Sequence, residues 1–213
     1  MKKIILILGA AALTFLSTSA QNSYSDTRSD LKMGVKAGLN LANIYDEESE
    51  DYNAGPKIGF VGGVFFAIPI GQYLGFHPEV LFSQKGCRAE GTYMGIIDYE
   101  YTRTSNFIDV PLLFAFKPSA LVTFVAGPQY SYLLSQKEVI KSGTFTDEQE
   151  DEFVNDNLRR NTLCFVGGID FNLNNLTVGT RAGWDLQDNN GDGTSTNPRY
   201  KNVWLQATLG FAF

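Results

Sequence analysis

The chain has 213 residues, a formal net charge of −6 and 44% hydrophobic residues. An acidic chain gives no reason to expect a nucleic-acid partner, because the phosphate backbone is bound by clustered Lys and Arg. The 16 Phe, 10 Tyr and 21 Gly favour strands and tight turns over helices, and 2 Cys are too few for a disulfide scaffold.

The first 20 residues have the pattern of a secretory signal peptide. Lys2 and Lys3 precede an apolar run at residues 4–16, and Thr18-Ser19-Ala20 gives the small-x-small pattern of a cleavage site. We expect cleavage after Ala20 and export of the chain. No Cys follows the site, so the sequence does not indicate a lipoprotein anchor.

Residues 21–30 form a polar lead that we expect to be disordered, and residues 31–213 have the pattern of eight strands. In the last of these strands the apolar Leu205, Leu209 and Phe211 alternate with Gln206 and Thr208. A period of two is typical of a strand with one apolar face. The expected strands cover residues 31–43, 57–68, 73–86, 107–116, 121–134, 162–171, 176–186 and 200–213.

The connections between these strands alternate strictly between long and short. Outer-membrane barrels have short periplasmic turns and long outer loops, whereas a soluble sandwich has no reason to keep this alternation. The sequence therefore predicts an all-β fold, an eight-stranded antiparallel up-and-down transmembrane β-barrel in the outer membrane of a Gram-negative bacterium. The short connections are residues 69–72, 117–120 and 172–175, and the long ones are 44–55, 87–106, 135–161 and 187–199. Within the second long connection, residues 99–103 (YEYTR) could extend a strand beyond the membrane.

Three segments carry a resemblance to a known family. Residues 77–86 (HPEVLFSQKG), 107–116 (FIDVPLLFAF) and 126–134 (AGPQYSYLL) resemble the PorT-like outer-membrane β-barrel family of Bacteroidetes. The resemblance extends over residues 31–213 and implies a fold and a location more than an activity. Because PorT itself is associated with a secretion apparatus, the resemblance also implies a possible accessory role in a secretion machine.

Charged residues occupy the strand faces opposite the apolar ones. They could line an ion path or a binding site, or they could be paired charges that fill the lumen. An eight-stranded barrel is only wide enough to be filled by its own side chains, and enclosed charges need partners, so we favour a lumen charge network. Its expected members are Lys36, Lys57, His77, Glu79, Lys85, Asp109, Asp170, Arg181 and Asp185.

No catalytic residue, metal site or cofactor is expected. His77 is the only His and is predicted near the periplasmic end of its strand beside Glu79, as a satisfied lumen residue rather than the base of a hydrolase. One His with the separated Cys87 and Cys164, which we expect to be unbonded, does not suit zinc. Residues 188–193 resemble the opening of a calcium loop, but Arg199 stands where that loop needs a Glu.

The sequence predicts a non-enzymatic protein with a structural or loop-mediated binding role. Its expected partners are outer-membrane lipid and lipopolysaccharide, and other outer-membrane or secretion proteins are candidate partners as well. Leu209, Phe211 and Phe213 resemble the signal that the barrel assembly machinery recognises. Two alternatives stay open besides the secretion accessory. One is an enzyme at the barrel rim, and the other is a soluble lipocalin-like ligand-binding barrel with its apolar faces turned inward.

Overall fold

The computed structural model describes residues 26, 28–45, 54–93, 97–142, 145–151, 159–189 and 200–213. The predicted signal peptide and most of the calcium-like segment lie outside these ranges. Within them, no helix has the length and hydropathy needed to cross a membrane.

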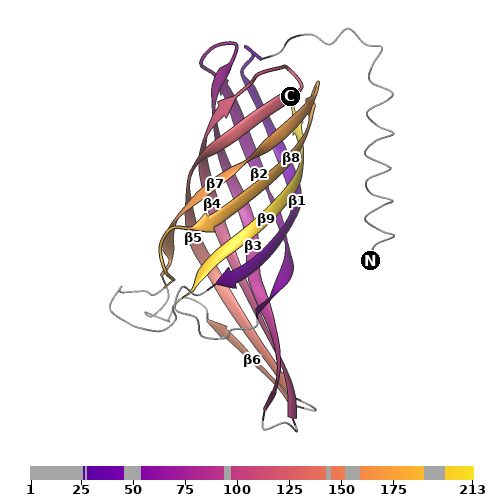
Figure 1. The fold of residues 1–213 in the computed structure, drawn as a ribbon, viewed down its shortest axis with the longest axis vertical. Helices are drawn as coiled ribbons and strands as arrows, with labels where there is room; N and C mark the ends of the chain where they lie inside the picture. The colour runs from indigo at the N-terminus through magenta and orange to yellow at the C-terminus, as the bar shows by residue number, and fades with distance from the viewer. Residues whose placement is uncertain are drawn as a thin grey trace.

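The described residues form nine strands in one antiparallel sheet (Figure 1). Eight of them contain an alternating stretch of apolar and polar residues, as period-two patterning requires, whereas the sixth (FTDEQED) does not. The strands are β1 Lys32–Tyr45, β2 Ala54–Pro69, β3 Leu74–Tyr93, β4 Ile97–Phe116, β5 Val122–Ser142, β6 Phe145–Asp151, β7 Asn161–Leu173, β8 Leu176–Asp185 and β9 Lys201–Ala212.

Eight of these strands close into a barrel. Going round the wall, the order is β1, β2, β3, β4, β5, β7, β8, β9 and back to β1, and every neighbouring pair is antiparallel. The β1–β9 seam runs from Gly34 opposite Ala212 to Tyr45 opposite Lys201. The predicted eight-stranded barrel is confirmed, and β6 is an additional short strand paired only with β5 among the described residues.

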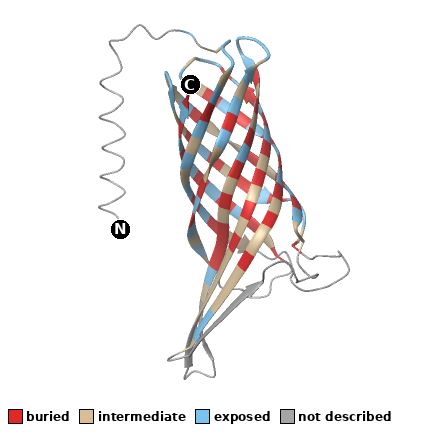
Figure 2. Cartoon of the chain, turned by 180° about the vertical axis from the view of Figure 1, so that it is seen from behind, coloured by how far each residue is buried: buried red, intermediate tan, exposed pale blue. Residues whose placement is uncertain are grey.

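The two faces of the wall differ as predicted. On β9, Leu205, Leu209 and Phe211 are 59%, 59% and 52% exposed, whereas Gln206 and Thr208 between them are buried. Figure 2 shows the same alternation of buried and exposed residues along the other wall strands. Lipid covers such an outer face, so no second protein layer is needed. The soluble lipocalin-like alternative is excluded, because it requires these faces to be exchanged.

The three short turns lie at one end of the barrel. The β2–β3 turn is closed by a hydrogen bond from Ile70 N to Leu74 O of 3.0 Å. In the two-residue β7–β8 turn, Asn174 has a φ of 56°, a left-handed conformation that Asn tolerates better than most residues. Because periplasmic turns of such barrels are the short ones, this end faces the periplasm.

At the other end, three strands continue far beyond the rest of the wall. Residues 87–93 and 97–106 lie in an expected long connection but are paired strand, since the β3–β4 ladder runs out to Tyr93 opposite Ile97. The strand expected at residues 99–103 is therefore part of a longer one. β4 has 20 residues where β8 has 10, and ten residues of strand add about 33 Å. We call the continuation of β3, β4 and β5, together with β6, the outer sheet (Figure 1). Outside the membrane both faces of a strand meet water, so no apolar face marks it in the sequence.

The end of the polar lead is attached to the periplasmic turns, contrary to the expected disorder. Lys117 Nζ donates to Arg28 O at 2.9 Å, and the Arg28 guanidinium donates to Lys117 O and Pro118 O, each at 3.4 Å. The guanidinium also lies 5.1 Å from the centre of the Tyr73 ring. Its hydrogen bonds to Asp26 hold the pKa of that exposed carboxyl below its usual range. We call residues 28–30 the N-terminal strap.

Candidate functional site

The barrel interior holds a group of buried charges near its periplasmic half. Arg181 on β8 makes two hydrogen bonds to Asp170 on β7, of 2.7 and 2.9 Å. It also lies 3.7 Å from Glu79 on β3, which in turn accepts a 2.6 Å hydrogen bond from Lys36 on β1. β3 and β8 are four places apart in the ring of eight, so the Arg181–Glu79 contact crosses the lumen. We call these four residues the inner cluster.

Small residues and an aromatic ring shape this cluster. A Cβ at Gly179 would lie 2.6 Å from Asp170 Oδ1 and 2.8 Å from Thr208 Oγ1, so the glycine leaves the space that the Arg181–Asp170 pair occupies. Lys36 Nζ lies 5.0 Å from the centre of the Phe65 ring, a cation–π distance. No side chain of the inner cluster is more than 8% exposed, so its charges depend on each other rather than on water.

A layer of uncharged amides and hydroxyls lies next along the lumen. Asn40 Nδ2 on β1 donates to Ser83 Oγ on β3 at 3.0 Å, and Gln206 Nε2 on β9 donates to Asn40 Oδ1 at 3.1 Å. All three side chains are buried. The layer ties three wall strands together without adding charge.

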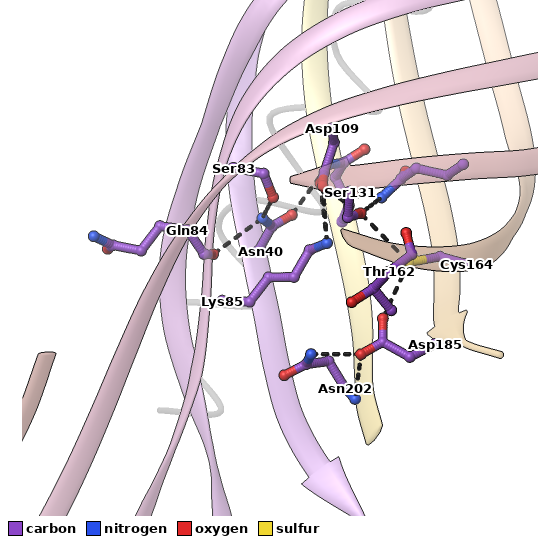
Figure 3. A network of polar contacts seen from close by, with 12 residues as sticks. Asn40, Ser83, Gln84, Lys85, Asp109, Ser131, Thr162, Cys164, Asp185 and Asn202 are labelled. Atoms are coloured by element: carbon purple, nitrogen blue, oxygen red, sulfur yellow. Dashed lines mark hydrogen bonds and ion pairs between the residues drawn. The ribbon is translucent and has the colours of Figure 1, made fainter. Parts of the chain in front are cut away.

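Beyond this layer, a chain of contacts runs round the interior (Figure 3). Lys85 Nζ on β3 lies 3.0 Å from Asp109 Oδ2 on β4, and Ser131 Oγ on β5 donates to Asp109 Oδ1 at 2.6 Å. Ser131 Oγ is 3.4 Å from Cys164 Sγ on β7, whose thiol donates to Asp185 Oδ1 on β8 at 3.1 Å. We call these five residues the central cluster, which joins five successive wall strands.

Aromatic rings enclose the cation of the central cluster. Lys85 is 1% exposed, and its Nζ lies 3.8 Å from the Trp204 ring centre and 4.7 Å from that of Phe107. A desolvated ammonium held by a carboxylate and two ring faces is a strong, specific arrangement. It also fills the lumen, because Trp204 is the largest fully buried side chain that the structure describes.

The outer end of the lumen has a third set of contacts. Arg103 Nε on β4 donates to Glu138 Oε1 on β5 at 2.8 Å, and the guanidinium lies 4.4 Å from the Tyr200 ring centre. The Tyr200 hydroxyl donates to Gln136 Oε1 at 3.2 Å. Tyr200 immediately precedes β9, which is opposite β4 in the ring, so this set crosses the lumen as well. We call it the mouth cluster.

Six of the nine predicted lumen charges are paired with one another, but two differ from expectation. Asp185 has no cation partner among the described residues and instead accepts hydrogen bonds from Asn202 N at 2.9 Å and from the Cys164 thiol. Lys57 is only half-buried at the outer end, opposite Ala42, and makes no ion pair with a described residue. The six paired residues are Lys36, Glu79, Lys85, Asp109, Asp170 and Arg181.

His77 also differs from expectation. It faces the lumen and is 9% exposed, but its Nε2 has no hydrogen-bond partner in the part of the chain described. The predicted satisfied histidine is therefore wrong at this atom. Glu79, two residues further along the same strand, is already engaged by Lys36 and Arg181.

Several interior residues were missed by the sequence reasoning. Ser131 belongs to the central cluster, Trp204 lies against Lys85 of that cluster, and Arg103 and Tyr200 belong to the mouth cluster. Ser131 and Trp204 each lie between outward-facing residues of their strands. The period-two alternation could therefore have identified both as interior residues. Arg103 was not assigned to the lumen, because residues 99–103 were expected to extend a strand beyond the membrane, where no face is enclosed.

Cys87 and Cys164 are both buried and free, on β3 and β7, which confirms that they are unbonded. Among the described residues, no group of three or more His, Cys, Asp or Glu side chains is placed to hold a metal ion. The residues of the predicted assembly signal all face outward: Leu209, Phe211 and Phe213 are 59%, 52% and 68% exposed.

A closed antiparallel barrel with an apolar outside and a charged, buried inside defines a transmembrane β-barrel protein. The family model described as "Outer membrane protein beta-barrel domain" matches residues 19–190. The chain belongs to this family and is an outer-membrane protein.

Solved structures with a similar chain course share little sequence with this one. Ail of Yersinia pestis, in complex with the heparin analogue sucrose octasulfate, has a TM-score of 0.48 at 12% identity, covering 86% of this chain and 99% of its own. Neisserial surface protein A has a TM-score of 0.48 at 14% identity, covering 85% and 97%. OprG of Pseudomonas aeruginosa has a TM-score of 0.36 at 12% identity, covering 86% and 94%. Comparison with curated proteins gives no match.

Proposed function

We propose that this protein is a non-enzymatic barrel of a Gram-negative outer membrane, with a sealed lumen, that acts by binding a partner through its outer sheet. The sealed lumen makes solute transport an unsuitable function, and the outer sheet is the part of the described chain that extends from the cell surface. Lipid and lipopolysaccharide would surround the wall.

The single observation that supports a sealed lumen is that side-chain contacts cross the lumen at two levels along the barrel. In the inner cluster Arg181 on β8 reaches Glu79 on β3, and in the mouth cluster Arg103 on β4 stacks on Tyr200 next to β9. Between these levels lie Trp204 and the buried Lys85. Breaking such buried pairs is costly, so they would not part to admit a solute.

The outer sheet has features that suit recognition of a protein partner. β6 is an edge strand, with β5 as its one partner among the described residues, and an edge presents backbone N–H and C=O groups to a further strand. Beside it on β5, Ile140 is 46% exposed. A partner could add a strand at β6 and cover this apolar side chain.

Reconstitution in planar bilayers tests the sealed lumen. The protein should give no steady conductance, and neither should a variant in which the outer sheet is shortened by removing residues 90–99 and 143–151. That variant keeps both levels of crossing contacts. A stable pore in the full-length protein would contradict the sealed lumen and favour a channel function.

Site-specific photocrosslinking in intact cells tests the outer sheet. A photoreactive side chain in place of Ile140 should crosslink to a protein, whereas one in place of Leu112, which is 42% exposed on the lipid-facing wall, should crosslink to lipid. Equal protein capture at both positions, or none at Ile140, would contradict binding through the outer sheet.

An accessory role in a secretion machine is a second candidate, favoured by the PorT-like segments at residues 77–86, 107–116 and 126–134. The test is purification of the tagged protein from its native membranes. Stoichiometric recovery of other secretion components would favour this role. Transient recovery of the barrel assembly machinery would instead agree with our proposal that Leu209, Phe211 and Phe213 act as its recognition signal.

A further inference from the structure

An open pocket lies at the periplasmic end of the barrel, where the first strand begins and the last strand ends. Its volume is about 420 Å³, within the range of about 300–1,000 Å³ of pockets that hold small ligands. Figure 1 shows the C-terminus at this end, beside the short turns. We call it the seam pocket, and its lining includes Asp30, Leu31 and Lys32, Asn174 and Asn175 of the β7–β8 turn, and Phe213.

Hydrogen bonds hold the walls of the seam pocket together. Ala212 N, at the end of β9, donates to Asn175 O at 2.7 Å, and Asn175 Nδ2 donates to Ala212 O at 2.8 Å. Phe213 N donates to Met33 O on β1 at 2.9 Å. These bonds tie the β7–β8 turn to β9 and β9 to β1, so the pocket is already formed before a ligand enters, as ligand pockets usually are.

The lining carries one charge of each sign. Asp30 of the N-terminal strap is exposed, and its negative charge acts on the ammonium of Lys32. Lys32 is half-buried at the start of β1, where its Nζ donates to Asn174 O at 3.4 Å. The positive charge of Lys32 also acts on Lys117, so a negative group bound beside Lys32 would offset the repulsion between these two lysines. A ligand that presents a negative and a positive group together therefore suits the pocket better than a simple anion.

Apolar side chains lie on the lipid side of the pocket. Leu31 and Phe213 are 69% and 68% exposed, the two highest values among the large apolar side chains that the structure describes. Both have the outward place in the alternation of the wall, whose outer face lipid covers. Because this end of the barrel faces the periplasm, the lipid here belongs to the periplasmic leaflet, which consists of phospholipid rather than lipopolysaccharide.

We infer that the seam pocket binds the headgroup of a zwitterionic phospholipid with a primary ammonium, of the phosphatidylethanolamine type. The phosphate accepts a hydrogen bond from Lys32 Nζ, the lipid ammonium donates to the Asp30 carboxylate, and the acyl chains lie along Leu31 and Phe213. Such a lipid covers the periplasmic end of the β1–β9 seam. The inference uses the location of the chain in the outer membrane and depends neither on the sealed lumen nor on the partner of the outer sheet.

Photocrosslinking of the unaltered protein in phosphatidylcholine vesicles tests the position of the lipid. The probe is a small fraction of phosphatidylethanolamine with a photoreactive group next to its glycerol. Labelling at Leu31 and Phe213 should be several-fold above labelling at Leu74, which is 55% exposed at the same end of the barrel and outside the pocket. A phosphatidylcholine probe should show a smaller preference, because its quaternary ammonium has no N–H to donate to Asp30.

Either of two results would overturn the inference. One is labelling that does not distinguish Leu31 and Phe213 from Leu74, and the other is an equal preference with the two probes. This experiment needs no substitution, so it does not depend on whether a variant folds.

Native mass spectrometry in detergent, with equal amounts of phosphatidylethanolamine and phosphatidylglycerol, tests the two charges. Phosphatidylglycerol has the phosphate but no cation, so phosphatidylethanolamine should be the more abundant bound lipid. The ratio should fall about fivefold in Asp30→Asn, which corresponds to about 1 kcal/mol, the upper end for an exposed ion pair. Lys32→Gln should lower the binding of both lipids, whereas Lys141→Gln, at a lysine of the outer sheet, should leave the ratio and the binding unchanged.

An unchanged ratio in Asp30→Asn would overturn the role of the carboxylate and with it the inference. A preference of the unaltered protein for phosphatidylglycerol would do the same, since it would indicate attraction of an anionic lipid by Lys32 alone. Neither measurement involves the outer sheet or the lumen, so these results leave the proposed function standing.

Discussion

The indole of Trp204 lies directly against the backbone of Gly183 on the neighbouring strand, where an added Cβ would be 2.3 Å from Cζ2 and 2.5 Å from Cε2. No real Cβ sits so close to a ring. The glycine therefore gives Trp204 the space to lie across the lumen, where its ring faces Lys85 Nζ at 3.8 Å.

Gly183→Ala should destabilise the folded barrel because the indole must move. Overpacking of this kind costs about 1–3 kcal/mol, and here the movement also disturbs the contact with Lys85. The matched control is Gly167→Ala on β7, where the nearest atom to the added Cβ is 3.8 Å away. Urea titration of the protein in lipid vesicles measures both. Equal stabilities would contradict the tight Gly183–Trp204 contact.

Arg181→Met should be among the most damaging single changes in the lumen. It removes the cation bound to Asp170 and close to Glu79, and an uncompensated buried charge costs about 3–5 kcal/mol. The double variant Arg181→Met, Asp170→Asn should be less damaging, because it also removes the abandoned charge. These free energies of unfolding come from the same titration. A double variant less stable than the single one would show that Asp170 has another cation partner.

Cys87 and Cys164 should resist labelling in the folded barrel, since both are fully buried. With a bulky maleimide, the folded protein should stay unmodified over minutes, while the unreduced protein in urea should take up two labels. A protein with no free thiols after unfolding would contradict the structure, because it would require a disulfide between β3 and β7.

The register of the wall could be read from the sequence because lipid and lumen demand opposite side chains at successive residues. Leu205 and Leu209 had to face one way once Gln206 faced the other. The outer sheet could not be predicted in the same way, because outside the membrane both faces of a strand meet water. Its pairing depends on backbone hydrogen bonds between β3, β4 and β5, which have no side-chain signature.

The pairing of the interior charges could not be predicted from the sequence either. Arg181 could have been paired with Asp185 on its own strand, but the structure gives it Asp170 on β7 and Glu79 on the opposite wall. Such choices depend on how far side chains reach across a lumen whose shear and tilt no single strand specifies. The same limit explains why His77 was expected to be a satisfied lumen residue.

The lipid-facing register has a direct test in Leu209→Arg. Leu209 is 59% exposed, lies four residues before Phe213 and is paired with Ala37 and Val178 in the wall. Arginine on the lipid face costs about 2–4 kcal/mol at the bilayer midplane and about 0–1 kcal/mol near an interface. We expect a loss at the upper end of these values for Leu209→Arg.

The matched control is Val203→Arg on the same face of β9, which lies opposite Trp184 towards the outer interface and should lose much less. Thr208→Arg is a poor control, because Thr208 lies close to Arg181 in the lumen. A Cβ at Gly179 would be 2.8 Å from Thr208 Oγ1 and 3.4 Å from Arg181 Nη1. An arginine at position 208 would therefore bring a second cation into the inner cluster. Folding into lipid vesicles followed by urea titration compares the two lipid-face variants. If Val203→Arg were the more damaging, the midplane would lie nearer the outer end of β9, and the outer sheet would begin closer to the membrane than the strand lengths indicate.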